Sequence, residues 1–429
     1  MMRLLSHFDP SPRARRLLRY GAAILGPVGA AVAQFALSIQ VLHSLDGASF
    51  GAFAFMLAMF QFCTGLWSAL FCAPLPIVLH DGGDGHDNAA VKGMFAMNLA
   101  AGLAAFLLFL GIGRSLGLAG APTALFAAYV STGLLRWFAR AFGYATGKPL
   151  RTIASDVLYS LVLLGAVVLL MLHGFSTAVA PAGALLVSAA AGLLPFVSGD
   201  FMRRLLAARP RALRLYAPVW RRHSGWSLLG VVTTEATGNA HVYLVTLLAG
   251  PTAFALLAAT ALLIRPIAVV MNALSEFERP QMARLIAKGN IAGAVATLRL
   301  FRIMLALAWL GSSLTAAAVL TWVPRLLFPE RYSLDELIVG TTLWSLVAGA
   351  RLLRVPESSM LQAAGVFRPL AYASLMSCWI SLAGVLLLMV LAAPVWSLLG
   401  VLFGEVVFAA WTWRQAKRWE RSAMQSVRS

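Results

Sequence analysis

The sequence has 429 residues, of which 60% are hydrophobic and only 12% charged, and its formal net charge is +18. A soluble globular domain has roughly 25% charged residues, so this composition excludes a soluble protein and indicates an integral membrane protein. Nucleic-acid binding is excluded too, because the arginines are dispersed between apolar spans and no soluble domain is left to hold a basic groove.

Twelve apolar segments, each bounded by charges or turn residues, are long enough to cross a bilayer as helices of about 20 residues. They cover residues 20–43, 50–79, 92–113, 118–138, 156–174, 178–199, 226–248, 252–274, 299–322, 335–353, 369–390 and 393–413. The sequence therefore predicts an all-α polytopic membrane protein with about twelve transmembrane helices. Pro74 and Pro76 in the second span and Pro266 in the eighth predict local bending, because each removes a backbone donor.

The cations lie mainly on one side of these spans. With a cytoplasmic N-terminus, Arg265 lies inside the membrane, and only Arg114, Arg325 and Arg331 of the 34 Lys and Arg residues lie on the outer side. Cytoplasmic loops are enriched in Lys and Arg, so both termini are predicted to be cytoplasmic. The cations assigned to the cytoplasmic side include Arg136, Arg140, Arg351 and Arg354.

The longest basic stretch, Arg203 to Arg222, follows the sixth span and divides the chain. We predict an N-terminal lobe (1–200), a basic cytoplasmic linker that contacts lipid head groups (201–225), a C-terminal lobe (226–414) and a cytoplasmic tail (415–429). Leu45-Asp46-Gly47-Ala48-Ser49 before the second span matches Leu248-Ala249-Gly250-Pro251-Thr252 before the eighth. Matches at corresponding positions are typical of repeats related by an axis along the membrane normal, with a cavity between them.

The seventh and eighth spans form a hairpin that carries Glu235 and Arg265 at membrane depth. Such groups are costly in lipid and are tolerated beside a polar cavity or a partner. Arg265 is expected to bind an anion, to form an ion pair with Glu235, or to extend toward the interface.

The seventh span also has a polar stripe, in which Thr234, Thr237 and His241 share a face beside Glu235 and Asn239. This stripe either lines a hydrated cavity or joins helices by hydrogen bonds.

Three further polar residues lie within spans. Gln34 and Ser38, one turn apart in the first span, predict a second cavity wall. Glu405 in the last span is either a protonated, hydrogen-bonded carboxyl with a structural role or a coupling-ion site. The loop from His80 to Asp87 has two histidines and three aspartates, but its glycines favour a solvated turn. No metal site and no cofactor are predicted. The candidate cavity residues are thus Arg265, Glu235, Asn239, His241, Gln34 and Ser38, with Glu405 as a possible coupling-ion site.

The hairpin and its continuation, Leu248-Ala249-Gly250-Pro251, Ala261 to Pro266 and Glu278 to Leu285, resemble the eighth-span region of bacterial polysaccharide flippases. These are the Wzx-like members of the multidrug/oligosaccharidyl-lipid/polysaccharide (MOP) exporter superfamily. The segment Leu45 to Leu79 and the turn Gly147-Lys148 look similar too. The sequence departs from the family at His80, which follows the second span where a basic residue is common.

This resemblance implies two six-helix lobes around a central cationic cavity that contains Arg265. It implies no enzyme activity but alternating-access transfer of undecaprenyl-diphosphate-linked oligosaccharide from the cytoplasmic to the periplasmic leaflet of the bacterial inner membrane. The product would serve O-antigen, capsule or exopolysaccharide assembly, with glycosyltransferases and a glycan polymerase of the pathway as partners.

Two other classes stay open. A cation-coupled multidrug antiporter of the same superfamily would prefer an acidic cavity to one that carries an arginine. A membrane-embedded glycan polymerase or acyltransferase would need catalytic side chains on a sizeable outer loop, for which the segment from Arg325 to Glu336 is the candidate.

Overall fold

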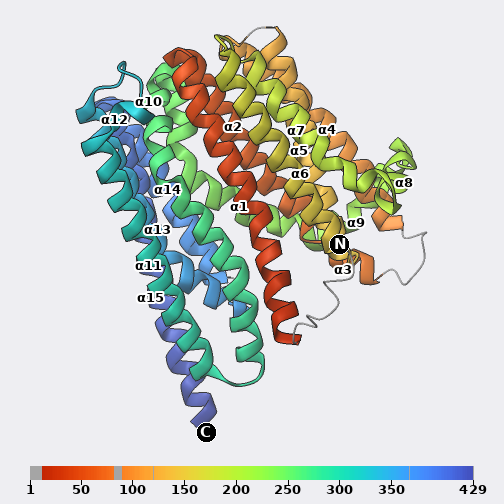
Figure 1. The fold of residues 1–429 in the computed structure, drawn as a ribbon. Helices are drawn as coiled ribbons and strands as arrows, with labels where there is room; N and C mark the ends of the chain where they lie inside the picture. Colours follow the sequence, from red (N-terminus) through yellow and green to blue (C-terminus); the bar gives the residue numbers. More distant parts are fainter. Residues whose placement is uncertain (1–11, 82–88, 119, 367, 429) are drawn as a thin grey trace, which may run out of the picture.

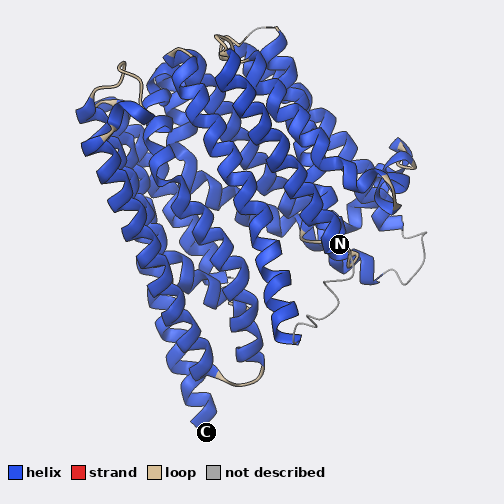
Figure 2. Cartoon of the chain, viewed as in Figure 1, coloured by secondary structure: helices blue, strands red, loops and turns tan. Residues whose placement is uncertain are grey.

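The structure is a computed structural model that describes residues 12–81, 89–118, 120–366 and 368–428, and within them every regular element is helical (Figures 1 and 2). The long helices are α1 (Pro12–Ser44), α2 (Gly47–Trp67), α4 (Ala89–Ser115), α5 (Ala121–Ala145), α6 (Pro149–His173), α7 (Val179–Val197), α10 (Gly225–Ala287), α11 (Ile291–Trp322), α13 (Leu334–Ala363), α14 (Arg368–Leu391) and α15 (Ser397–Arg428). The short elements are η1 (Ser68–Cys72), α3 (Leu75–Asp81), α8 (Asp200–Leu206), η2 (Pro210–Tyr216), α9 (Ala217–Val219), η3 (Trp220–Ser224), α12 (Pro324–Leu327) and η4 (Pro394–Trp396).

The described helices confirm the predicted polytopic fold of about twelve membrane crossings. Nine helical stretches in the described ranges are long and apolar enough to span a bilayer. One of them, Gly230–Asn272, contains two crossings, because Gly250 interrupts α10 with a φ of 84° that suits glycine. The shorter apolar stretch Val28–Ser44 belongs to α1. Helix α5 has 25 residues, enough for a crossing, but Arg136 and Arg140 make it less apolar.

The crossings form two six-helix lobes. In the first lobe α1 packs on α6, and α5 packs on α4 and α7; in the second, α10 packs on α11, α13 and α14, while α15 packs on α13 and α14. Figure 1 shows the first-lobe helices α4–α7 on one side and the blue second-lobe helices on the other, with α1 and α2 between them. The two lobes meet mainly where α2 packs along α10.

The two matched turns of the sequence lie together at one end of the bundle. A Cβ atom at Gly47 would make an ordinary contact with Thr252, whereas one at Gly51 would collide with the Pro251 carbonyl, so Gly51 allows this close approach. Arg331, next to α12, adds two hydrogen bonds of 2.6 Å to the carbonyl oxygens of Leu42 and Leu45 at the end of α1. We call this the closed end.

Prolines shape the second crossing as expected. The α-helix α2 changes to the π-helix η1 before Pro74 and resumes as α3, because proline cannot donate a hydrogen bond in a helix. The second part of α10 stays helical through Pro266, so no break occurs there.

The basic segment of residues 201–225 is largely helical and folds against the first lobe. Tyr216 and Ser224 both donate hydrogen bonds to the Leu70 carbonyl, at 2.7 and 2.8 Å, and η2 packs on α4. These contacts tie the basic segment to η1. Most of the loop from His80 to Asp87 lies outside the described residues, and the described ones include no group of three acidic, His or Cys residues placed for a metal ion.

Candidate binding cavity

A cavity of about 1130 Å³ lies between the lobes, lined by α1, α2, α5, α6, α10, α13 and α15. Toward the closed end it stops at Phe50, Phe53 and Phe254, all of them buried. At the opposite end its lining includes the exposed residues Asn272 and Arg284. The cavity therefore opens at this second end, which we call the basic end. Its volume is at or above the top of the range of about 300–1,000 Å³ that is usual for small-molecule pockets.

All the candidate residues from the sequence lie in the lining of this one cavity. They are Gln34 and Ser38 on α1, Glu235, Asn239, His241 and Arg265 on α10, and Glu405 on α15. His241 and Glu405 are only 1% exposed and lie behind the cavity surface. The His241 ring packs edge-on against Trp344, with ring centroids 4.9 Å apart, and so forms part of the wall. The roles of these residues in binding stay predictions.

Arg265 bridges the lobes through neutral groups. Its Nη1 donates a hydrogen bond to the Ser38 hydroxyl at 3.2 Å. Ser38 in turn donates to the Gln34 carbonyl, and the Gln34 amide donates to the Tyr159 hydroxyl at 3.0 Å. No carboxylate in the described part of the chain forms an ion pair with Arg265. A cation withdrawn from water without a counter-charge is costly, which keeps anion binding among the roles predicted for Arg265.

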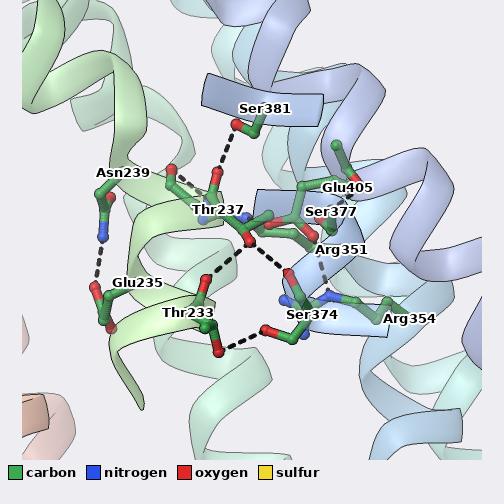
Figure 3. Close-up of polar contacts among 12 residues, drawn as sticks. Thr233, Glu235, Thr237, Asn239, Arg351, Arg354, Ser374, Ser377, Ser381 and Glu405 are labelled. Atoms are coloured by element: carbon green, nitrogen blue, oxygen red, sulfur yellow. Dashed lines mark hydrogen bonds and ion pairs between the residues drawn. The ribbon is translucent and has the colours of Figure 1, made fainter. Parts of the chain in front are cut away.

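One of the three alternatives for Arg265, an ion pair with Glu235, is not found among the described residues. Glu235 instead accepts a hydrogen bond of 2.6 Å from the Asn239 amide, one turn along the same helix (Figure 3). The reason is geometric, since Glu235 on the first arm of α10 faces α2, where a Cβ atom at Gly65 would lie 3.8 Å from its Oε1. Arg265, on the second arm, reaches α1.

Glu405 is ion-paired with two arginines of α13. Its oxygens accept hydrogen bonds from Nε of Arg351 at 2.8 Å and Nε of Arg354 at 3.0 Å (Figure 3). Arg351 also donates to the Gly238 carbonyl at 3.0 Å. These two contacts favour a structural role for Glu405, and the coupling-ion role stays a prediction. Both arginines line the cavity within α13, which continues to Ala363, so they do not mark the end of a helix.

The first lobe contains a comparable cluster. Asp156 on α6 pairs with Nη2 of Arg136 at 2.5 Å and with Nε of Arg140 at 2.8 Å. The Arg136 guanidinium also lies 4.3 Å from the centre of the Tyr159 ring. Helices α5 and α13 are the fourth and tenth crossings, so corresponding helices supply the arginine pair in each lobe. The predicted span 118–138 ends near Arg136 and Arg140, whereas α5 continues to Ala145 and both arginines line the cavity. The signal in the sequence is their spacing of about one turn, which recurs at Arg351 and Arg354.

The described lining of the cavity is cationic. It contains six arginines, namely Arg136, Arg140, Arg265, Arg284, Arg351 and Arg354, and three carboxylates, Asp156, Glu235 and Glu405. Six positive and three negative charges leave a formal net charge of +3. A cleft lined mainly by one sign of charge concentrates ligands of the opposite sign.

The polar stripe of α10 divides between two roles. Ser381 donates a hydrogen bond to the Thr237 carbonyl at 2.9 Å, and Ser374 donates to the Thr233 hydroxyl at 3.1 Å (Figure 3). These bonds join α10 to α14, so the interhelical alternative holds for this face. Glu235 and Asn239 lie on the side that lines the cavity.

Comparison with known proteins identifies the fold. No protein-family model and no curated protein matches the chain. An inward-facing multidrug resistance MATE family transporter of the MOP superfamily is 15% identical, with a TM-score of 0.68 over 95% of this chain and 99% of that one. The lipid II flippase MurJ, in an inward closed conformation, is 11% identical, with a TM-score of 0.66 over 94% and 87% of the two chains.

A third match is a MOP superfamily transporter from Pyrococcus furiosus, whose description reports a reverse polarity of its binding pocket. It is 15% identical, with a TM-score of 0.62 over 95% of this chain and 96% of that one. The chain therefore has the fold of the MOP superfamily transporters, with two six-helix lobes around a central cavity. At 11 to 15% identity, this likeness establishes the fold and not the cargo.

Proposed function

We propose that the protein is a Wzx-like flippase that moves undecaprenyl-diphosphate-linked oligosaccharide from the cytoplasmic to the periplasmic leaflet of a bacterial inner membrane. The glycan would serve O-antigen, capsule or exopolysaccharide assembly. The supporting observation is Arg265, a cavity arginine that donates a hydrogen bond to the neutral Ser38. A diphosphate that crosses hydrocarbon needs a cation to offset its desolvation. The planar guanidinium suits it because it binds phosphate oxygens in a bidentate manner.

The net positive charge and the volume of the cavity support the same cargo. A formal charge of +3 in the described lining attracts an anionic head group and disfavours a cationic drug. A volume of about 1130 Å³ leaves room for sugars beside the diphosphate. These features favour the flippase over the multidrug antiporter.

The orientation of the cavity fits loading from the cytoplasm. Arg284, at the mouth, and the basic segment of residues 201–225 belong to the side that the distribution of Lys and Arg assigns to the cytoplasm. Glycosyltransferases that assemble the glycan would act on this side, and a polymerase on the other. Release would then require the closed end to open while the lobes rock together at the basic end.

The segment from Arg325 to Glu336 is the candidate for catalytic side chains. Its polar groups have structural partners. Arg325 pairs with Glu330 at 3.3 Å, and Arg331 binds the end of α1. Ser333 accepts a hydrogen bond from the Glu336 backbone N–H as the N-cap of α13. We therefore propose no catalytic role for this segment.

The test uses purified protein in vesicles loaded with undecaprenyl diphosphate that carries one N-acetylglucosamine. An impermeant lectin that binds this sugar measures the fraction of probe on the outer surface. Protein-containing vesicles should expose the inner-leaflet probe faster than protein-free vesicles. Equal rates, together with uptake of a cationic dye by the protein-containing vesicles alone, would contradict the flippase and favour the antiporter.

A further inference from the structure

One stretch of α5 brings aromatic side chains to the cavity beyond the Asp156 cluster. Trp137 and Tyr144 both line the cavity, and they are 36% and 45% exposed. The Trp137 ring is held in place, because its Nε1 donates a hydrogen bond of 2.8 Å to the Ser68 hydroxyl and the Arg140 guanidinium lies 4.7 Å from its ring centre. An indole fixed at the cavity wall is a preformed apolar surface beside polar groups.

Polar side chains of α2 and η1 extend this wall. Gln61, Thr64 and Ser68 lie at spacings of three and four residues, so they share one helix face, and all three line the cavity. The hydroxyls of Thr64 and Ser68 donate to carbonyls of their own helix. The exposed Gln61 amide has no hydrogen-bond partner among the described residues, and it offers two donors and an acceptor.

The second lobe presents a different aromatic group, since Trp344 on α13 lines the cavity but is only partly exposed and packs against His241. Arg136 and Arg351 begin the arginine pairs of the two lobes, and the residue after Arg351 is Leu352, which is only 8% exposed. An exposed tryptophan is therefore not a requirement of the shared architecture. Among the described lining residues, Trp137 of the first lobe is the exposed tryptophan.

We infer that Trp137 and Gln61 form a subsite for a pyranose ring of the cargo glycan. The inference rests on the proposed function and adds where the sugar binds. A pyranose has one face of C–H groups that packs on an aromatic ring and a rim of hydroxyls that bonds to amides. Arg265 is joined to Tyr159 through Ser38 and Gln34. The Arg136 guanidinium lies over the Tyr159 ring, and Trp137 is the next residue of α5. A glycan that extends from a diphosphate at Arg265 along this wall would reach Trp137.

The test compares two probes on the purified full chain in nanodiscs, by native mass spectrometry. The probes are undecaprenyl diphosphate and the same lipid with one N-acetylglucosamine. Stacking on an aromatic ring needs only a pyranose face, so one sugar suffices. We expect the native protein to bind the sugar-bearing probe about five-fold more tightly. Trp137→Ala should remove this difference and leave binding of the bare lipid unchanged, Trp137→Phe should keep part of it, and Gln61→Ala should reduce it.

The matched control is Trp379→Ala, since Trp379 on α14 is 68% exposed and lies outside the cavity lining. It should change neither affinity. Binding of the bare lipid also reports folding of each variant. Equal binding of both probes by the native protein, or an equal loss of both in Trp137→Ala, would overturn the sugar subsite while leaving the diphosphate site intact. Failure of the native protein to bind either probe would overturn the proposed function itself.

Discussion

The Nη1 atom of Arg265 donates a hydrogen bond to the Ser38 hydroxyl at 3.2 Å, and this contact joins the second lobe to the first across the cavity. The other arginines of the cavity interior differ from Arg265 in having carboxylate partners. Arg136 and Arg140 share Asp156, and Arg351 and Arg354 share Glu405. Arg265 has a neutral partner instead, so its charge is available to a ligand.

Glu405→Gln should destabilise the protein. The substitution leaves Arg351 and Arg354 side by side without a counter-charge, and breaking a buried ion pair costs roughly 3–5 kcal/mol, less here because Arg351 is 24% exposed. Thermal unfolding in detergent should show a lower Tm. The double variant Glu405→Gln with Arg354→Gln should recover part of the loss, because it restores the net charge of the cluster.

Glu330→Gln is the control for that loss. Glu330 also pairs with an arginine, but both side chains are about 80% exposed, and such pairs contribute little to stability. Its Tm should stay at the native value. A Tm for Glu405→Gln as high as that of Glu330→Gln would rule out a structural role for the cluster.

Glu235→Gln should leave the amount of membrane-inserted protein unchanged. Glu235 does not neutralise Arg265, and glutamine can still accept the hydrogen bond from Asn239. The combination with Arg265→Gln should therefore give no rescue of abundance. Quantitative immunoblots of membranes provide the measurement. A drop in abundance for Glu235→Gln that the double variant restores would indicate a pair in another conformation of the transport cycle.

Arg331→Ala should favour opening of the closed end. Its guanidinium donates to the carbonyls of Leu42 and Leu45, and hydrogen bonds to charged groups contribute about 1.5–3 kcal/mol when buried. Because Arg331 is exposed, we expect only a few-fold increase in the population of the state with an open closed end. The readout is labelling of Ala54→Cys, a cavity position, by a thiol reagent added from the periplasmic side.

Arg325→Ala is the matched control for this change. Arg325 lies on the same outer segment and pairs with the exposed Glu330 only. Labelling of Ala54→Cys should rise with Arg331→Ala and not with Arg325→Ala. Identical labelling in both backgrounds would show that Arg331 does not hold the closed end together.

The crossings were predictable because their signals are local. Apolar length placed the spans, and the turn at Gly250-Pro251 predicted the break that the backbone shows at φ 84°. The arginine clusters were not predicted. Apolarity falls at the first charge, whereas α13 continues to Ala363, well beyond Arg351 and Arg354. A prediction from apolar length ends a helix at a charged residue, because the sequence does not show that a cavity lies beside that residue.

The pairing of those charges depends on tertiary contacts. Glu405 is more than 50 residues from Arg351, on a helix that packs against α13. Glu235 and Arg265, by contrast, lie on the two arms of one hairpin. Glu235 nevertheless faces α2, whereas Arg265 reaches α1. Depth in the membrane located the polar residues of the cavity, but the rotation of each helix, which the sequence does not fix locally, decided their partners.

Binding of bare undecaprenyl diphosphate to Arg265 variants tests the central claim most directly. In nanodiscs, Arg265→Gln should weaken binding at least about ten-fold, since a charge-assisted bidentate contact is lost, and Arg265→Lys should restore only part of it because an ammonium lacks the planar fork. Arg284→Gln, at the exposed cavity mouth, should have a smaller effect. Native affinity in Arg265→Gln would contradict the account.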